Sequence, residues 1–584
     1  MDRTAWIVVS LATIGLIGTF FWEQRQNEAL LKYRQQQAAY AAQMSPTPVD
    51  SSTLSTTSGA SQPMLEQTPE QNLPEKVEIL ENDVAKLHFS NNRGGLASID
   101  LLTHKAEHGH PVELNSASAP AIGAISQTPN SWADGGYDLT TDPTSGTATL
   151  KRQLNDSVEV TKTYTLAKQA SLKDDYQVKL AITFNNSGSS ESKVPGYFVS
   201  TGAAAPIHRN DRAYATQFDW YRDGKYNSIA VNWFDSGKLL GLIQTSPAKE
   251  VYLAPDNDNN PVKILWASVS NQYFATILAP VDIGGTHVWA RRIQIPNNDH
   301  QPQLQGIQGA LEIPGFQLAS GESKTVEFTI YGGPKEFNRL AKLPNDQAEV
   351  MNFGWAKGIS EMLLTVMNTL HAWVKSYALT IIIMTIIIRS LLWPLQNAAT
   401  KSMRKMAQLS PIINELKEKH KDDPQRMQQE TMKLYKEYGI NPFGGCLPML
   451  IQIPIFFGFY GMLDKAIELR NSPFFWVSDL SQPDTVFHLA GFPINILPLV
   501  MTATQFWQMS ITPKTGDSAQ QRMFLLMPLI FLFICYNYAS ALALYWTAQN
   551  LFIVVQIYLT RNQMQAPLVK VPAAPAVANR KSYR

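Results

Sequence analysis

Two patterns of apolar and polar residues divide this chain of 584 residues. Between residues 77 and 343, apolar and polar residues alternate, which is the pattern of half-buried β-strands. Between residues 377 and 562, long apolar runs recur instead. Such runs are long enough for membrane helices, because about 20 helical residues cross the hydrocarbon core of a bilayer. The pattern therefore predicts a large β domain followed by a bundle of membrane helices.

Residues 77–343 are predicted to form one antiparallel β-sandwich. The alternation of period two is clean in residues 158–166, 176–184 and 326–330. Clusters of Asn and Gly, such as the one at residues 91–95, separate these runs and predict turns. Many short strands with few helical patterns are typical of two packed sheets rather than of a mixed fold.

Three histidines of this domain are close enough in sequence to bind a metal: His104, His108 and His110. They lie among charged residues and glycine in a predicted loop, so a solvated loop is the favoured interpretation. Three aromatic residues offer a sugar- or peptide-binding cleft as one interpretation and core packing as the commoner one: Trp220, Tyr221 and Trp233. No nucleophile–base pattern accompanies them, and the sequence predicts no catalytic site, metal site or cofactor.

Five apolar segments of the C-terminal part are predicted to cross the membrane. They are residues 377–395, 446–463, 487–509, 523–537 and 541–559. Several contain proline, which membrane helices tolerate better than soluble helices do. Just before the first of them, at residues 344–376, apolar residues recur at helical spacing on one face. This segment is predicted to be an amphipathic helix on the outer membrane interface.

A sixth apolar segment lies near the N-terminus, at residues 5–22, between Arg3 and Glu23. It fits either a cleaved signal peptide or an uncleaved anchor. An anchor at residues 1–22 is favoured, because the run is long for a signal peptide and no small-x-small cleavage site follows it directly. Residues 23–76 are rich in Gln, Ser, Thr, Ala and Pro, so they are predicted to form a disordered polar linker.

Lysine and arginine predict how the chain lies in the membrane, because they concentrate in cytoplasmic loops. Residues 396–445 contain nine of them, whereas residues 464–486 contain only Lys465 and Arg470. Residues 396–445 and the tail at 563–584 are therefore predicted to be cytoplasmic. With six spans, both termini lie inside and the β domain lies on the outer side.

Residues 396–445 are predicted to form a helical hairpin. Apolar residues recur at helical spacing on both sides of a turn that ends at Pro424, a residue suited to the first turn of a helix. The predicted apolar seam includes Met403, Met406, Met427 and Leu434. Methionine suits an adaptable binding surface, although it also serves simply to fill such a seam.

One charged residue, Arg389, lies inside a predicted span. At the centre of a membrane helix an arginine costs roughly 2.5–3.5 kcal/mol, and each Ile or Leu returns about 0.3–0.6 kcal/mol. The many Ile and Leu residues of 377–395 offset that cost, so the segment still inserts. Thr385 lies one turn earlier on the same face. Either the arginine extends to the nearer membrane surface, or it lies in a wet cavity within the membrane, which is the favoured interpretation.

Composition narrows the possible functions. The mean hydropathy of −0.15 is too low for a chain that is embedded throughout. A net charge of +1 argues against nucleic acid as the main partner. The two cysteines, Cys446 and Cys535, both fall in apolar spans, which excludes disulfides in the β domain and a cysteine zinc site. The sequence also lacks a phosphate-binding loop of the Gly-x4-Gly-Lys-Ser/Thr type.

Four motifs stand out in the membrane part: Arg389-x4-Pro394, Asn441-Pro442-x-Gly444-Gly445-Cys446-x-Pro448, Gln452-x-Pro454-Ile455-Phe456 and Leu544-Tyr545. Through these motifs the membrane part resembles the YidC/Oxa/Alb family of membrane protein insertases. They match in order, spacing and topology over about residues 355–562. The anchor, linker and β domain are similar to those of the Gram-negative bacterial form. The chain departs from many relatives at residues 539–541, where it has Ala-Ser-Ala instead of Pro-Ser-Gly.

The resemblance implies an α-helical polytopic membrane protein with a five-helix insertase core at residues 377–562, an N-terminal anchor helix and a large all-β periplasmic supersandwich domain similar to sugar mutarotases. It also implies a hydrophilic groove that is open to the cytoplasm and to lipid. The positions that match groove or substrate-contacting residues of the family are Arg389, Thr385, Gln452, Phe456, Phe459, Tyr545 and Trp546.

By the same resemblance, the chain inserts inner-membrane proteins and helps them to fold, alone or with the Sec translocon, and is not an enzyme. Its implied partners are nascent membrane proteins and membrane lipids, with the Sec translocon, the signal-recognition-particle receptor and the ribosome as candidates. Its implied location is the bacterial inner membrane, with the β domain in the periplasm. The alternative is a secondary transporter or channel, which usually has internal repeats and polar residues converging from several spans. A sugar enzyme anchored to the membrane would need a general acid/base pair, which the sequence does not place.

Overall fold

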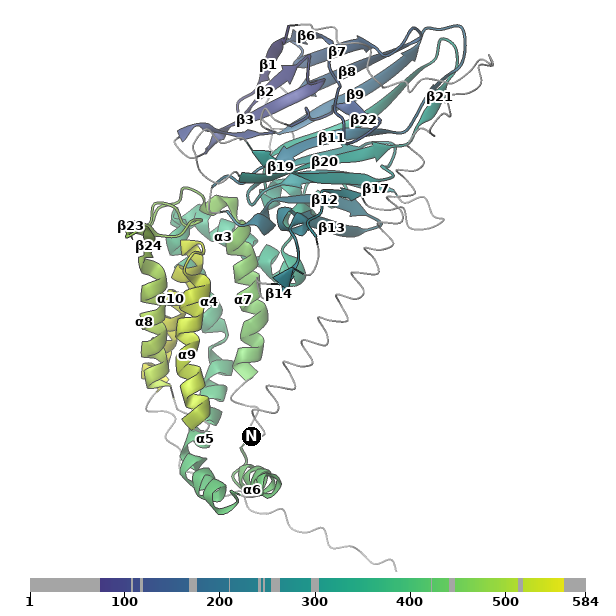
Figure 1. The fold of residues 1–584 in the computed structure, drawn as a ribbon. Coiled ribbons are helices and arrows are strands. Elements are labelled where there is room, and N and C mark those ends of the chain that lie inside the picture. The colour runs from purple at the N-terminus through teal and green to yellow at the C-terminus, as the bar shows by residue number, and fades with distance from the viewer. Residues whose placement is uncertain are drawn as a thin grey trace, which may run out of the picture. The chain divides into compact units, whose positions relative to one another are not determined.

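The computed structural model describes residues 74–560 except 107–108, 116–118, 167–175, 209–210, 240–242, 245–246, 254–262, 296–303, 422, 441–446 and 513–517. The predicted anchor at 1–22, nearly all of the linker at 23–76 and the tail at 563–584 lie outside the described residues. The chain divides into a β unit, residues 1–271 with 276–332, and a helical unit, residues 272–275 with 333–584 (Figure 1). This division falls slightly before the predicted end of the β domain at residue 343.

The β unit contains a nine-stranded and a five-stranded antiparallel sheet. In spatial order, the nine strands are β13 (Lys225–Ala230), β12 (Gln217–Arg222), β17 (Ile264–Ser270), β18 (Phe274–Pro280), β22 (Ser323–Pro334), β9 (Gln177–Asn186), β8 (Val158–Leu166), β7 (Thr147–Gln153) and β6 (Asp138–Asp142). The five are β16 (Val251–Leu253), β19 (Val288–Ile295), β20 (Leu304–Ile313), β11 (Tyr197–Ala204) and β5 (Ile125–Ser126). Strands β11 and β20 pack against β17, so the two sheets form a sandwich.

Smaller sheets complete the β unit. A four-stranded sheet joins β1 (Val77–Glu81), β2 (Ala85–Ser90), β3 (Gly95–Lys105) and β4 (Pro111–Leu114). Two-stranded pairs join β10 (Ser192–Val194) to β21 (Phe316–Leu318) and β14 (Lys238–Leu239) to β15 (Ile243–Gln244). Short 3-10 helices, η2 (Ala213–Ala215) and η3 (Val231–Phe234), connect strands. The expectation of a large β domain is confirmed.

The alternation seen in the sequence corresponds to alternating burial. In β8 every second side chain from Val158 to Leu166 is buried, and β8 pairs with β9 along its whole length. All residues of β11 are buried, and this strand lies between β20 and β5 in its sheet and packs against β17 of the other sheet. A one-residue change of register would turn the buried side chains of β8 outward, so the pattern fixes the pairing strongly.

The aromatic residues that offered a possible cleft pack in the core instead. Trp220 and Tyr221 are buried, and Tyr221 stacks on Trp266 at a ring distance of 5.8 Å. Trp233 packs edge-on against Tyr252 at 5.1 Å, and the Lys249 ammonium group lies 4.0 Å from its ring centre. These contacts account for the aromatic cluster without a ligand.

The structure does not test whether the three histidines come together, because it describes only two of them. His104 lies near the end of β3, and His108 is outside the described residues. Within the described ranges, no group of three or more His, Cys, Asp or Glu side chains is arranged to hold a metal ion.

A buried ion network lies in the β unit. Lys162 of β8 and Asp134 are essentially inaccessible to solvent, and the lysine donates to Asp134 and, at 2.6 Å, to the carbonyl oxygen of Gly94. Asp134 also accepts from the Tyr137 hydroxyl group at 2.7 Å and from Arg152 at 3.0 Å. Burial lowers the pKa of Lys162 to about 8. The network therefore connects the loop before β6 to β7 and β8.

The helical unit consists mainly of eight helices. They are α3 (Lys357–Val374), α4 (Tyr377–Leu391), α5 (Trp393–Lys419), α6 (Pro424–Glu437), α7 (Leu447–Lys465), α8 (Ile496–Ile511), α9 (Ser518–Cys535) and α10 (Ser540–Thr560). Short elements are α2 (Phe337–Leu340), η4 (Gln347–Met351), η5 (Gly354–Ala356), η7 (Ile467–Leu469) and a hairpin of β23 (Thr485–Leu489) and β24 (Phe492–Asn495). Helix α10 packs against α8, α4 and α7, so it is the central helix of the bundle (Figure 1).

Length and composition identify fewer candidate spans than the sequence pattern does. Among the described helices, α10 alone is long and apolar enough by itself, and α4 with α5 qualifies only as a pair bent by 63°. The predicted segment 377–395 is divided at this bend. Pro394 explains the break, because proline cannot donate a backbone hydrogen bond within a helix and is accommodated in the first turn of α5.

The start predicted for the membrane helix at residues 487–509 is wrong. The helix begins only at Ile496, and the residues before it form the β23–β24 hairpin. Ala490 and Gly491 lie between the strands with φ values of 51° and 82°. Two successive residues with positive φ make the tight turn that suits the twist of antiparallel strands. The apolar composition of this hairpin made it resemble the start of a membrane helix.

A buried carboxyl group links η7 to α3 in the helical unit. The Asn368 side-chain amide donates to Glu468 Oε1 at 2.9 Å. Within the described residues, Glu468 Oε2 and Asn368 Oδ1 are buried without a hydrogen-bond partner. Burial raises the pKa of Glu468, and the nearby Glu336 carboxylate raises it further. The folded protein therefore favours the neutral form of this side chain.

This shift predicts a pH dependence of stability. Because the pKa of Glu468 in the folded protein is above its ordinary 4.5, the stability that this group contributes is present below pH 4.5 and is lost as the pH rises through the folded pKa. We expect the unfolding temperature in detergent to fall over that interval, and Glu468→Gln to reduce the fall. Thermal unfolding at a series of pH values measures both, with the exposed Glu418→Gln as the control. An unchanged pH profile in Glu468→Gln would contradict the assignment.

Candidate functional site

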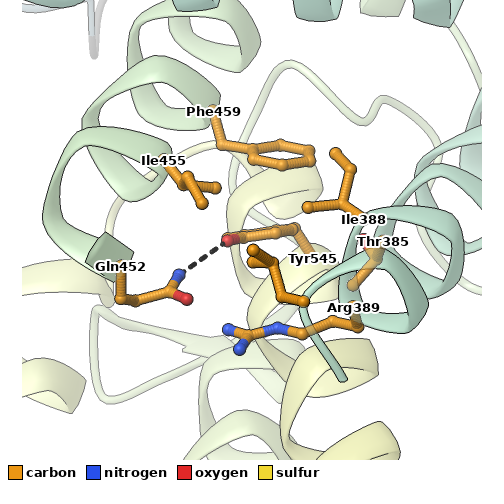
Figure 2. Close-up of a pocket in the computed structure, with 8 residues that line it drawn as sticks. Thr385, Ile388, Arg389, Gln452, Ile455, Phe459 and Tyr545 are labelled. Carbon is orange, nitrogen blue, oxygen red and sulfur yellow. Dashed lines mark hydrogen bonds between the residues drawn. The ribbon is translucent and has the colours of Figure 1, made fainter. Parts of the chain in front are cut away.

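A narrow pocket lies among α4, α7 and α10 of the helical unit (Figure 2). The residues that line it are Thr385, Ile388, Arg389, Leu392, Gln452, Ile455, Phe459 and Tyr545. The pocket, together with the open space beside it, measures about 180 Å³. We call this narrow pocket the polar seam, and the open, hydrophilic groove that the sequence resemblance implies stays a prediction.

Arg389 supplies the positive charge of this pocket. Its side chain extends from α4 toward the side of the pocket where Gln452 lies (Figure 2). The residue is only 9% exposed, so it does not extend to the outer surface of the bundle. No acidic residue of the described chain lines the pocket. The charge is therefore held among helices without a carboxylate beside it, which is costly unless an anion or water reaches it.

Thr385 lies on the same face of α4, as its spacing from Arg389 predicted. It is buried, and its hydroxyl group donates to the carbonyl oxygen of Ile381 at 2.7 Å. This bond within the helix satisfies the hydroxyl hydrogen and leaves only acceptor capacity toward the pocket. Thr385 therefore adds limited polarity to the wall beside Arg389.

Gln452 and Tyr545 form the polar link across the pocket. The Gln452 amide nitrogen lies 3.3 Å from the Tyr545 hydroxyl oxygen and 3.3 Å from Gln549 Oε1. The Tyr545 ring stacks on Phe459 with 4.1 Å between ring centres. Helices α7 and α10 therefore meet beside the pocket through two aromatic rings and through hydrogen bonds that are longer than the usual 2.9–3.0 Å.

Phe456 and Trp546 do not line the pocket. Their rings meet each other at 5.0 Å, and Trp546 also contacts Phe531 of α9 at 4.5 Å. They form an aromatic cluster of α7, α9 and α10 instead. The structure thus brings five of the seven residues predicted from the resemblance into one pocket and places the other two in this cluster.

Matching single positions of this chain to the family's groove positions did not identify several polar residues near the pocket. Gln549 is buried and bonds to Gln452, and the Gln556 amide nitrogen donates to Asn397 Oδ1 at 3.0 Å. Asn550 donates to Thr504 Oγ1 of α8 at 3.2 Å. A sequence signal for the first two exists, because Tyr545, Gln549 and Gln556 are spaced by four and seven residues and so share one face of a helix.

The predicted cytoplasmic hairpin corresponds to α5 and α6, which pack against each other. Asp423 accepts from the backbone N–H groups of Gln425 and Arg426, which fixes the start of α6. The four residues predicted to form the apolar seam of this hairpin are half-buried: Met403, Met406, Met427 and Leu434. We call α5 and α6 the arm. Helix α5 begins at Trp393, slightly before the predicted start at residue 396.

Comparison with known proteins gives two family matches. Residues 369–567 match the family described as 60Kd inner membrane protein, and residues 79–366 match the one described as YidC periplasmic domain. A protein named membrane protein insertase YidC from Nitratidesulfovibrio vulgaris strain DP4 is 34% identical over 345 residues, which cover 57% of this chain and 60% of that protein. The chain thus matches less than two thirds of the length of this relative.

A second relative and one solved structure extend the comparison. The protein of the same name from strain DSM 19637 / Miyazaki F is 30% identical over 486 residues, which cover 80% of this chain and 81% of the relative. A crystal structure described as an active YidC insertase with the first transmembrane domain resolved covers 83% of this chain and 94% of its own, at 17% identity and a TM-score of 0.33.

Proposed function

Since this chain belongs to the YidC family of membrane proteins, we propose that it acts as a membrane protein insertase. It has the periplasmic domain of that family. In the proposed function, the chain receives nascent membrane proteins and releases their apolar segments into the inner membrane. The observation that carries this proposal is the buried Arg389 in a polar seam between apolar helices, with no acidic partner lining it among the described residues.

The physical task of an insertase explains why such a seam is useful. A polar segment of an incoming chain crosses hydrocarbon only at a high cost, because its backbone and charged groups lose their hydrogen bonds to water. A polar seam that reaches into the bundle shortens this apolar distance. Arg389 attracts acidic residues of the segment. The apolar helix that follows partitions into lipid and supplies the free energy, at about 0.8 kcal/mol for each buried CH₂ group.

Because the seam is narrow, a substrate in the proposed function separates its walls. The Phe459–Tyr545 ring stack and the Gln452 hydrogen bonds are the contacts that part. Each neutral hydrogen bond contributes only about 0.5–1.5 kcal/mol, and the separated groups regain partners from the substrate backbone or water. Opening between α7 and α10 therefore requires few interactions to break.

The finer parts of the proposal concern topology and partners. The arm lies in the cytoplasm in this proposal, because Lys and Arg concentrate in cytoplasmic loops and residues 396–445 are rich in both. With six spans, both termini lie on the same side as the arm. The arm receives the nascent chain, with the ribosome and the signal-recognition-particle receptor as partners on this side. Insertion proceeds alone or beside the Sec translocon. Half-buried methionines between α5 and α6 suit this task, because their flexible side chains adapt to different apolar segments.

Site-specific photo-crosslinking tests the proposed function. A photoreactive residue is introduced at Phe456, Trp546 or Met427, and ribosome-bound nascent chains of a membrane protein are presented at increasing lengths. We expect crosslinks from Met427 with short chains and from Phe456 and Trp546 with longer ones. Val555 is the control, because it is exposed on the opposite face of α10 from Trp546. Equal crosslinking from Val555 and Trp546, or none from either, would argue against a substrate path along this seam.

A further inference from the structure

The β23–β24 hairpin exposes an apolar face. Four apolar side chains, which we call the apolar tip, are between 47% and 64% exposed: Val486, Phe487, Leu489 and Phe492. Leu489 pairs with Phe492 and lies two residues from Phe487, so these three side chains share one face of the hairpin, while the pairing shifts by one residue at Val486. A two-stranded hairpin is only marginally stable in water, and exposed apolar strands promote aggregation. The apolar tip therefore requires an apolar environment.

The base of the hairpin is firmly attached to the bundle, although the tip is not covered. The Asn495 side-chain amide donates to the carbonyl oxygen of Tyr536 at 2.7 Å, and the Tyr536 hydroxyl group donates to the carbonyl oxygen of Pro493 at 2.8 Å. Thr485 donates to Asn495 Oδ1 at 2.7 Å, which joins the two strands at their base. These bonds fix the hairpin relative to the connection between α9 and α10, so the apolar tip projects at a defined position.

The apolar tip is continuous with the lipid-facing surface of the bundle. Strand β24 leads directly into α8, and the hairpin lies at the end of that helix (Figure 1). The Phe492 ring packs against Tyr536 at 5.4 Å, and Tyr536 follows closely after Phe533 and Ile534 of α9, which are strongly exposed.

Phe475 and Trp476 are also exposed, in the loop that precedes the hairpin, and the Trp476 indole donates to Asp484 Oδ2 at 3.0 Å. That oxygen also accepts from the backbone of Leu497 in the first turn of α8. Aromatic residues at helix ends are typical of the membrane interface.

Charge and backbone chemistry define how deep the hairpin lies. Residues 485–495 contain no Lys, Arg, Asp or Glu, and His488 is their only titratable residue. Moving the hairpin out of bulk water therefore costs no free energy for the burial of a Lys, Arg, Asp or Glu charge. The outer edges of a two-stranded hairpin, however, keep unpaired N–H and C=O groups, which are not tolerated in the hydrocarbon core. The boundary between lipid headgroups and acyl chains satisfies both conditions.

We propose that the β23–β24 hairpin inserts its apolar tip into the phospholipid leaflet at the N-terminal end of α8, at the depth of the headgroup–acyl boundary. It acts there as a lipid anchor that holds this end of α8 and α9 at a fixed depth. The inference depends on α8 and α9 lying in a membrane and does not depend on the insertase activity. A phospholipid bilayer is the occupant because the exposed tip and the exposed end of α9 form one apolar surface.

Fluorescent labels measure this contact directly. In a full-length background with Cys446→Ser and Cys535→Ala, Leu489→Cys and Val486→Cys each receive an environment-sensitive label, so two positions of the apolar tip are sampled. The protein is reconstituted into vesicles of phosphatidylethanolamine and phosphatidylglycerol. We expect a blue-shifted emission from both positions and at least a twofold loss of intensity when lipids carry a quencher near the top of the acyl chain. Ser145→Cys in an exposed turn of the β unit is the control, which we expect only aqueous iodide to quench.

Two results would overturn the inference. Quenching of the two hairpin labels by iodide as strongly as at Ser145→Cys would place the tip in water. Shielding from both iodide and the lipid quencher would mean that protein, not lipid, covers the tip. Because two separate positions of the tip are used, a folding defect in one variant leaves the other informative. The readout does not involve insertion of any substrate, so it remains valid whether or not the proposed function is correct.

Discussion

Replacing Arg389 with Ala should lower the insertion of substrates with acidic translocated segments by roughly 10- to 150-fold, while substrates with neutral segments change much less. The range follows from the loss of one hydrogen bond to a charged group, which is worth about 1.5–3 kcal/mol, since each 1.4 kcal/mol corresponds to about tenfold. Arg389→Lys should restore most of the activity, because it keeps the charge at nearly the same position. Insertion into vesicles of matched substrates that differ only in the charge of the segment measures the effect.

A structural defect would give a different result. Arg389 is buried in a pocket that no acidic residue of the described chain lines, so removing it should not lower the unfolding temperature by more than a small amount. The matched control is Arg426→Ala, which removes an exposed positive charge from the arm. Equal insertion of acidic and neutral substrates by Arg389→Ala would show that this charge is dispensable in the seam.

The second large effect concerns the stability of the β unit. Lys162→Met should destabilise it by about 3–5 kcal/mol, because it leaves the Asp134 carboxylate buried with its closest cation removed. Arg152 and Tyr137 still bond to Asp134, but neither occupies the position between Asp134 and the Gly94 carbonyl group. Denaturant unfolding of the full-length protein, followed by tryptophan fluorescence, measures the change.

Two variants make the measurement specific. Lys151→Met removes an exposed lysine that pairs with Glu159, and such surface pairs contribute about 0–1 kcal/mol. Lys162→Met combined with Asp134→Asn should recover part of the stability, since no buried carboxylate then remains without its lysine, although Arg152 loses its ion pair. Equal destabilisation by Lys162→Met and Lys151→Met would mean that the buried network does not stabilise the fold.

Periodicity predicted much of the fold, because it depends on which side chains face a core. The alternation in residues 158–166 corresponds to β8, whose buried and less buried residues alternate as expected. The same reasoning was wrong for residues 487–495, since an exposed apolar hairpin and a membrane helix share one composition. Only the turn at Ala490 and Gly491 distinguishes them, and this turn depends on the positive φ values of the two residues.

The pocket was predictable in part. Arg389 and Gln452 belong to motifs that the sequence shows, and the structure brings them together with Tyr545. The ring stack of Phe459 on Tyr545 was not predictable, because it joins residues of two helices far apart in sequence. The ion network of Lys162 was also hidden, because Asp134 lies 28 residues away in a loop without periodicity.

The bend between α4 and α5 gives the arm a mechanical role in the proposed function. Leu392 lies between the last residue of α4 and the first residue of α5 and also lines the pocket. The pivot of the arm is therefore part of the wall beside Arg389. If the arm receives a growing polypeptide as proposed, a swing of α5 about this residue displaces that wall, and the force on the far end of the arm reaches the seam through this hinge.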